Sequence, residues 1–235
     1  MPGLSRGWVG DTLALYARAF GRGARLALAN WPVGLVVILY GVLLESVFAL
    51  VAPLGLVGGI IAYLALVACA SSWLSLVERV IRVGRVDLRD LPAGFGAYLG
   101  DLLTVFFLLW VLRLVVAVLL PPTATFLHIL FMLAVIVFLN AVPELIYLGR
   151  HAATELLVES YRFIGENWIE WFPANLVLIG CVLAVFALPA GPYNLIVNTA
   201  LGLSLYFAMI ARGLLFLELS TTSRRAREFR RRAAS

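Results

Sequence analysis

Residues 32–77 read PVGLVVILYGVLLESVFALV, then APL, then GLVGGIIAYLALVACASSWLSLV. The two long runs, 32–51 and 55–77, each match the roughly 20 apolar residues that a helix needs to cross about 30 Å of hydrocarbon. The segment between them is long enough only for a tight turn. The two runs are therefore predicted to form a transmembrane hairpin.

The same length criterion predicts six spanning helices, which pair into three hairpins. The runs cover residues 32–51, 55–77, 102–120, 126–148, 171–188 and 195–219. Of the 235 residues, 63% are hydrophobic and only 13% are charged, with a mean hydropathy of +1.01, whereas soluble domains carry about 25% charged residues. We therefore expect an all-α polytopic membrane protein, with one six-helix domain over residues 1–223 and a basic tail over residues 224–235.

Charged residues near the turns lie on one side of this pattern. The turns at 51–54, 121–125 and 189–194 carry no formal charge. The segments on the other side carry arginines, namely Arg6, Arg18, Arg22, Arg25, Arg79, Arg82, Arg85, Arg89, Arg150 and Arg162. Short loops rich in basic residues stay in the cytoplasm. Both termini are therefore predicted to be cytoplasmic.

The segment before each hairpin has an amphipathic pattern of its own. In residues 11–30 and 152–172, charged side chains recur at helical spacing while aromatic and aliphatic side chains fall elsewhere around the helix; residues 88–101 form a shorter, weaker copy. We expect three cytoplasmic interfacial helices in the headgroup region, each leading into a hairpin.

One acidic and one basic residue interrupt the spans. Glu45 precedes Pro53 by eight residues, and Arg113 precedes Pro121 by eight residues. At 1.5 Å per residue, both lie roughly 12 Å from the external end of their helices. Because an isolated charge at that depth is costly, the sequence predicts an intramembrane ion pair between Glu45 and Arg113. The pair either fixes helix packing, or supplies a site in which Arg113 binds an anion or Glu45 carries protons.

Small and polar residues in two spans indicate helix-packing faces. Gly55 and Gly59 have the GxxxG spacing, and Asn194, Asn198 and Gly202 recur every four residues in the last span. Small residues allow close approach of helices in a membrane, and amide side chains form hydrogen bonds between them. These five residues are expected to mediate helix contacts.

Further charged residues fall near the predicted cytoplasmic boundary. Arg212, Glu144 and Glu218 are interpreted as anchors whose long side chains reach the interface. The tail carries six arginines, Arg224, Arg225, Arg227, Arg230, Arg231 and Arg232. Basic clusters of this kind bind the anionic cytoplasmic leaflet. The net charge of +5 is thus attributed to membrane orientation, and no nucleic-acid partner is expected.

The sequence contains no recognisable catalytic or metal-binding pattern. HExxH, GxSxG and Walker motifs are absent, and Cys69 and Cys181 each lie inside an apolar run without a neighbouring histidine or cysteine at ligand spacing. We therefore expect a non-enzymatic chain without a metal or other cofactor.

Two segments resemble a family. ESYRFIGENW at 159–168, which leads into a span, and GRVDLRDL at 84–91 are similar to segments of six-helix bacterial inner-membrane proteins of the YciC type and of the membrane domain that accompanies some glycerophosphodiesterases. The resemblance covers the layout of most of the chain. It implies a bacterial cytoplasmic (inner) membrane protein and transfers no functional residue.

Two functions from different classes remain open. The chain is either a non-catalytic accessory or scaffold subunit that assembles with other subunits or with itself, or shapes the bilayer, or it is a small transporter or lipid-handling permease that uses Glu45 and Arg113. The minimal loops and apolar spans favour the first. Paired broken helices, which mark midplane substrate sites in many transporters, are not evident in the sequence.

Overall fold

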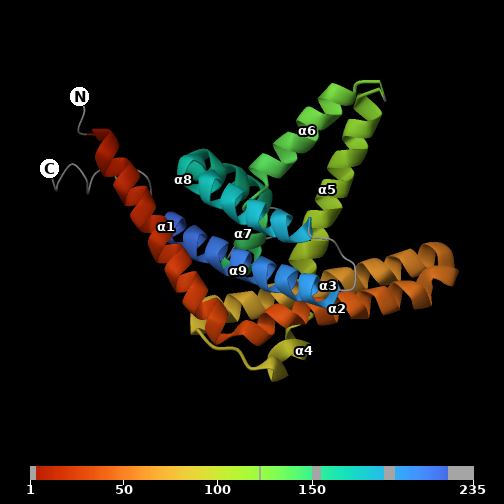
Figure 1. Cartoon of the computed structure of the whole chain (residues 1–235). Helices are drawn as coiled ribbons and strands as arrows, with labels where there is room; N and C mark the ends of the chain where they lie inside the picture. The colour runs from red at the N-terminus through yellow and green to blue at the C-terminus, as the bar shows by residue number, and fades with distance from the viewer. Residues whose placement is uncertain (1–3, 122, 150–154, 188–193, 222–235) are drawn as a thin grey trace.

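The computed structural model describes residues 4–121, 123–149, 155–187 and 194–221, most of which are helical, with no strand among them. The elements are α1 (Leu4–Ala29), α2 (Trp31–Val51), η1 (Ala52–Leu54), α3 (Gly55–Val83), η2 (Leu88–Asp90), α4 (Leu91–Gly94), α5 (Leu99–Leu119), α6 (Thr125–Phe138), α7 (Val142–Leu148), α8 (Glu155–Phe186) and α9 (Asn194–Thr221). Figure 1 shows their arrangement.

The described helices include five stretches that are long and apolar enough to cross a membrane. The first, Trp31–Val83, contains both α2 and α3, so it accounts for two of the six predicted spans. The expected all-helical fold with multiple membrane-spanning segments is thereby confirmed at this level. The described structure contains no bilayer, so the orientation of the termini stays a prediction.

Helix α9 is the centre of the molecule. It packs against α1, α2, α3, α7 and α8. Half of the residues in its most apolar 18-residue stretch are buried, compared with 11% in the corresponding stretches of α2–α3 and of α5. The fully buried side chains Ile210 and Leu215 lie on it. Helices α1, α2 and α8 are therefore positioned largely through their contacts with α9, whereas α4 and α5 pack against α3 and α6 packs against α8.

Two glycines allow α2 to approach α9 closely. A Cβ atom added at Gly202 of α9 would lie 2.8 Å from the carbonyl oxygen of Gly34 in α2, and one added at Gly34 would lie 2.7 Å from Leu203. Tyr206, one turn further along α9, stacks edge-on against Trp73 of α3 with ring centroids 5.8 Å apart. The three helices therefore share a tightly packed centre.

The junction between α1 and α2 is held by one buried amide. The side chain of Asn30 donates hydrogen bonds to the carbonyl oxygens of Leu26 (3.0 Å) and Gly84 (2.9 Å) and accepts one from the backbone N–H of Val86 (3.2 Å). Gly84 has φ +84°, which ends α3 in the left-handed conformation that favours glycine. Asn30 thus ties the first helix break to the end of the first hairpin.

Serine side chains hold the short α4 against α3. Ser71 donates to the carbonyl oxygen of Gly94 (3.0 Å) and accepts from the N–H of Tyr98 (2.8 Å). Ser72 accepts from the hydroxyl of Tyr40 (2.6 Å) and donates to the carbonyl of Leu91 (3.0 Å). The segment predicted as an interfacial helix over 88–101 is therefore a 3-10 turn, one helical turn and the start of α5, folded onto the polar face of α3.

The predicted interfacial helices differ from one another in the structure. Residues 11–29 belong to α1, which packs along α9. Residues 155–172 are the first half of α8, which continues through Pro173 without a break, so the expected interfacial helix and the predicted span from 171 form one continuous helix. Two carbonyls in the turn before the proline accept side-chain hydrogen bonds, Glu170 from Tyr16 and Trp171 from Asn175, both at 2.7 Å. Such bonds allow a proline inside a helix.

The predicted fourth span is interrupted. It consists of α6 and α7 with a break at residues 139–141. Pro143 lies in the first turn of α7, where a backbone N–H has no acceptor within the helix, so the missing N–H of proline removes no helical hydrogen bond. This break leaves the backbone of Asn140 available to other partners.

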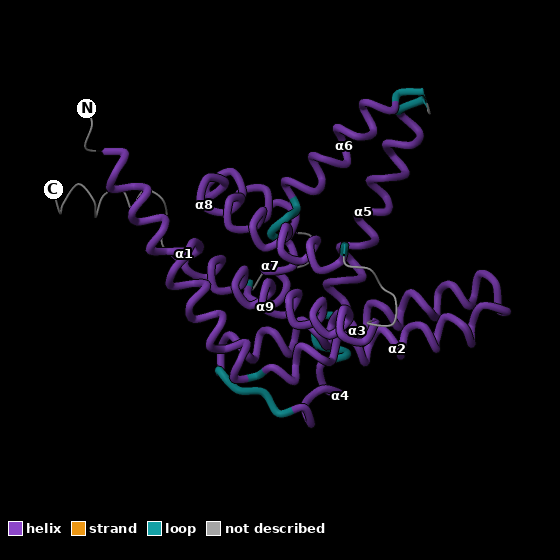
Figure 2. The backbone as a smooth tube through the Cα atoms, in the orientation of Figure 1, coloured by secondary structure: helices purple, strands orange, loops and turns teal. Residues whose placement is uncertain are grey.

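The three predicted hairpins are packed to different extents. Helices α2 and α3 lie side by side, as do α8 and α9. Helices α5 and α6 instead diverge from the turn after Leu119 and form an open V, as Figures 1 and 2 show. We call the α2/α3 hairpin the first arm and the α5/α6 pair the second arm; the two arms point in different directions (Figure 1).

Replacing Gly202 with alanine is expected to lower the free energy of unfolding by about 1–3 kcal/mol, because the new Cβ would press on the backbone of Gly34. The matched control is Gly59→Ala in α3, where an added Cβ meets nothing within 4 Å. Alanine there should be neutral or stabilising by up to about 1 kcal/mol. Unfolding in mixed micelles, followed by circular dichroism, gives both values; equal destabilisation by the two variants would contradict the close contact.

Candidate functional site

The most buried charged group in the described structure is an ion pair between α7 and α9. Arg212 of α9 donates from Nε to Oε1 of Glu144 (2.7 Å) and from Nη2 to Oε2 of Glu144 (2.9 Å). The same Nη2 donates to the carbonyl oxygen of Asn140 (2.7 Å). The guanidinium carbon lies 5.3 Å from the ring centroid of Trp171 in α8. We call these four residues the Arg212 cluster.

Every member of the Arg212 cluster has a partner inside the chain. The Glu144 side chain is fully buried and that of Arg212 is 13% exposed. The amide oxygen of Asn140 accepts from the indole N–H of Trp171 (2.9 Å), which completes the network. A buried charge pair is tolerated when its geometry is good and its remaining hydrogen-bonding groups are satisfied. The cluster therefore joins α7, α8 and α9 and offers no unpaired charge to a ligand.

The local sequence explains why the cluster forms. The break between α6 and α7 releases the carbonyl of Asn140 from the helical ladder, and Pro143 begins a new helix whose first turn carries Glu144. The carboxylate then faces Arg212, near the last third of α9. The expectation that Arg212 and Glu144 are boundary anchors is wrong, because both are buried against each other. Glu218, in contrast, is partly exposed and pairs with Arg18 of α1 at 3.2 Å.

A second group of buried polar residues lies next to the cluster along α8. Tyr16 of α1 donates to the backbone of Glu170. Burial raises the pKa of the Tyr16 phenol, and the Glu170 carboxylate raises that pKa further, so the hydroxyl stays protonated and remains a donor. Glu170 Oε2, Asn175 Oδ1 and the hydroxyl of Tyr206 are buried without a protein partner. Glu170 and Asn175 thus place unpartnered polar atoms on α8, and Tyr206 places one where α9 meets α2 and α3.

The predicted intramembrane pair is not formed within the described chain. Glu45 on α2 and Arg113 on α5 are both exposed, and no ion pair joins them. Helix α3 packs against both α2 and α5. The buried residues of α5, Leu102 and Val105, lie near its start, and Arg113 lies in the second half of the helix, where no residue is buried.

The predicted packing residues fall in different environments. Gly202 is buried at the close contact with α2, whereas Asn198 is exposed. Asn194 begins α9, but its side chain lies outside the described part. Gly55 has φ +55° and starts α3.

The close backbone approach at the tip of the first arm involves a glycine that the GxxxG spacing does not include. Neither Gly55 nor Gly59 has an atom within 4 Å of an added Cβ. At Gly58, in contrast, an added Cβ would lie 2.0 Å from the carbonyl oxygen of Val51. Gly58 therefore allows the tight turn at the tip of the arm.

The arginines assigned to anionic lipid, Arg224, Arg225, Arg227, Arg230, Arg231 and Arg232, lie outside the described residues.

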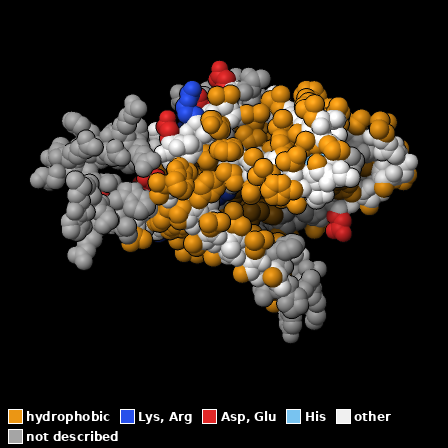
Figure 3. All heavy atoms as spheres, turned by 90° about the horizontal axis from the view of Figure 1, so that it is seen from above, with side chains coloured by type: hydrophobic (Ala, Val, Ile, Leu, Met, Phe, Trp, Pro, Cys, Tyr) orange, Lys and Arg blue, Asp and Glu red, His pale blue; other side chains and the backbone are white. Residues whose placement is uncertain are grey.

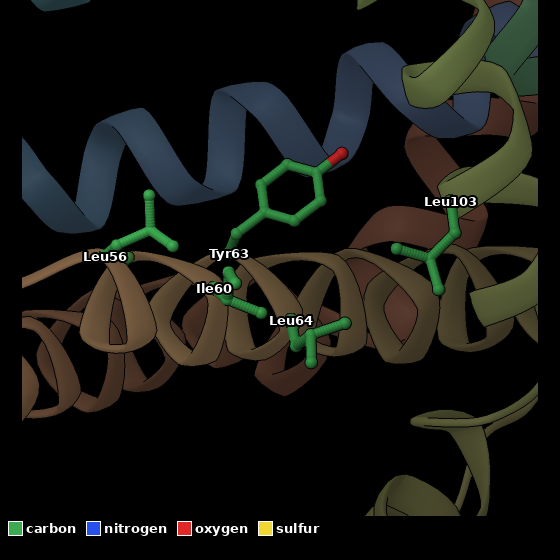
Figure 4. A pocket seen from close by; sticks show the side chains of 6 residues that line it. Leu56, Ile60, Tyr63, Leu64 and Leu103 are labelled. Atoms are coloured by element: carbon green, nitrogen blue, oxygen red, sulfur yellow. The ribbon is translucent and has the colours of Figure 1, made fainter.

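An apolar hollow of about 440 Å³ lies on the face of α3 beside the start of α5. Figure 4 shows Leu56, Ile60, Tyr63 and Leu64 of α3 and Leu103 of α5 around it. The tyrosine ring stacks edge-on against Phe106 with ring centroids 6.2 Å apart. The hollow is open and holds no charged group, so it suits an apolar group such as a lipid chain or a helix side chain and provides no catalytic group.

Comparisons with known proteins yield no match: no protein-family model, curated protein or solved structure is significantly similar to the chain. The resemblance to YciC-type proteins therefore gains no support from them. Within the described ranges, no group of three or more His, Cys, Asp or Glu side chains is arranged to hold a metal ion.

Replacing Arg212 with leucine is expected to lower the free energy of unfolding by about 3–5 kcal/mol, because it leaves the Glu144 carboxylate buried and unpaired. The double variant Arg212→Leu/Glu144→Leu should recover a large part of this loss. The matched control is Arg162→Leu, whose pair with Glu159 in α8 is exposed on the arginine side and contributes less than about 1 kcal/mol.

A double-mutant cycle of unfolding free energies in micelles measures the coupling within the Arg212–Glu144 pair. Additive losses from the two single substitutions would show that the pair is not coupled and would contradict its structural role.

Proposed function

We propose that the chain is a non-catalytic, multi-pass protein of the bacterial cytoplasmic membrane that serves as an accessory or scaffold subunit and assembles with other chains through its two arms. The supporting contrast lies between the centre and the arms. The centre around α9 holds the internally paired Arg212 and Glu144, whereas the arms present apolar faces on most sides. Figure 3 shows how far apolar side chains extend over one face of the molecule.

One observation carries the proposal: each arm has a charged side chain inside an apolar helix, and the chain itself covers neither charge. Glu45 and Arg113 are exposed, with apolar neighbours that are exposed as well, among them Val42 (58%) and Trp110 (56%). Lipid can cover the apolar side chains, but it cannot compensate a charge in hydrocarbon. A protein partner can cover both at once.

The geometry supports assembly more than transport. A transporter that used Glu45 and Arg113 would need them along one interior path, because substrate and coupling ions bind at a common site between helices. The two residues instead lie on the outside of different arms, with α3 packed against both helices. An outward-facing charge within a span is the arrangement expected at a subunit interface.

The proposed orientation places the turns at 51–54 and 121–125 outside and the basic tail at the cytoplasmic leaflet. In right-side-out cells, single cysteines at Leu54 and Thr123 in a background lacking Cys69 and Cys181 should react with an impermeant maleimide, whereas a cysteine at Ser235 should react only after permeabilisation. Labelling of Ser235 and Thr123 from the same side would contradict the topology.

Extraction of the tagged chain in its native lipid, using a membrane-solubilising polymer, tests the proposed assembly. We expect particles with more than one protein chain, identified by mass spectrometry and mass photometry. The variants Glu45→Gln and Arg113→Gln should yield fewer assembled particles than the wild type. The control variant Arg22→Gln, on the exposed surface of α1, should not. A wild-type chain found only as a single copy with lipid would contradict the proposal.

A further inference from the structure

Glu45 and Arg113 occupy equivalent positions on their helices. Glu45 lies six residues before the end of α2, and Arg113 lies six residues before the end of α5. Both helices end in turns without formal charge, which the proposed orientation places at the same membrane face. At 1.5 Å per residue, each charge therefore lies roughly 9 Å along its helix from the helix end. They differ in the sign of their charge.

The two charges are complementary, but one copy of the chain does not join them. Helix α3 packs against both α2 and α5, and the residues of α5 from 111 to 119, which include Arg113, are not buried. Glu45 and Arg113 are both exposed. Each charge is therefore available to another molecule that presents the opposite charge.

We infer that the partner is a second copy of this chain, bound so that Glu45 of each copy pairs with Arg113 of the other. This inference rests on the proposed assembly and names its partner. The contact requires a two-fold axis along the membrane normal that brings Glu45 of one copy to Arg113 of the other. The same operation forms the ion pair twice, as in an isologous interface.

The surroundings of the two charges suit a contact between helices. Trp110, one turn before Arg113, is 56% exposed, and Phe48, one turn after Glu45, is 49% exposed. Exposed aromatic side chains beside a charge are typical of the centre of protein interfaces, where they exclude solvent. In the dimer these rings would surround the ion pairs and replace lipid contacts.

Co-expression of differently tagged charge-reversed chains tests the inference. Glu45→Arg alone and Arg113→Glu alone place like charges opposite each other in a homodimer, so neither should self-associate. Mixed together, one copy contributes two arginines and the other two glutamates, so the heterodimer regains both pairs. We expect at least about tenfold more of the second tag to be captured with the first from mixed than from single-variant cells, measured in native lipid particles.

A neutral series covers the case in which reversed chains fail to insert. Glu45→Gln mixed with Arg113→Gln retains one ion pair per dimer, whereas each variant alone leaves two unpaired charges. Preferential capture between the two variants therefore supports the same interface. The matched control is the pair of Ser46→Gln and Leu112→Gln, which adds an amide beside each charge on the same exposed helices and should give no preference between mixed and single cells.

Other outcomes overturn the inference in distinguishable ways. If association is restored only when Glu45→Arg and Arg113→Glu are in the same chain, the pair forms within one copy. If the wild-type chain captures other membrane proteins but not itself, the self-pairing is wrong and the proposed function stands. If the wild type is monomeric and captures nothing, both are wrong.

Discussion

A charged side chain in an apolar environment requires a partner, and the Arg212 cluster shows how this chain supplies one. The guanidinium of Arg212 lies among packed helices because Glu144 and the carbonyl of Asn140 meet it. That arrangement requires the break between α6 and α7. A continuous helix through residues 125–148 would keep the Asn140 carbonyl in its own hydrogen-bond ladder. The burial of Arg212 therefore depends on the helix break, which frees the Asn140 carbonyl to accept its hydrogen bond.

The cluster and the glycine contact together explain why α9 is central. At one end, Gly202 lets the backbone of α9 approach α2, so packing there depends on small size. Towards the other end, Arg212 holds α7 and α8 through directional bonds. In a bilayer, close packing and interhelical polar contacts are the main forces available, because lipid removes most of the hydrophobic driving force between helices. The close contact at Gly202 and the hydrogen bonds of Arg212 thus hold different turns of the same helix.

Much of the fold follows from the sequence, because span length and apolar composition are local properties. The helical spans, the tight turn after Val51 and the weakness near Pro143 are all predictable in this way. The continuity of α8 through Pro173 is not, since it depends on side-chain bonds around the proline, including the one from Tyr16 in a distant helix. The partner of Arg212 is likewise distant: Glu144 is 68 residues away, and nothing in the local pattern connects the two.

The position of Gly58 illustrates the same limit at short range. Gly55 and Gly59 fit a known spacing, yet the close backbone contact is at Gly58, because the geometry of the turn rather than the helix period decides which residue approaches Val51. Spacing indicates which side chains share a helix face, but it does not indicate what that face meets.

The same reasoning distinguishes the two pairs of charges. Arg212 and Glu144 look like interfacial anchors in the sequence and are buried together, whereas Glu45 and Arg113 look like a pair and lie apart. The bundle around α9 pairs Arg212 with Glu144, so the two unpaired charges on the arms contrast with the ion pair at the centre. They are confined to the helices with the least burial, at the same distance from the helix end and with opposite signs. The chain pairs a buried charge at its centre and leaves two complementary charges unpaired on its arms. This arrangement is expected when the partner of each unpaired charge belongs to another molecule.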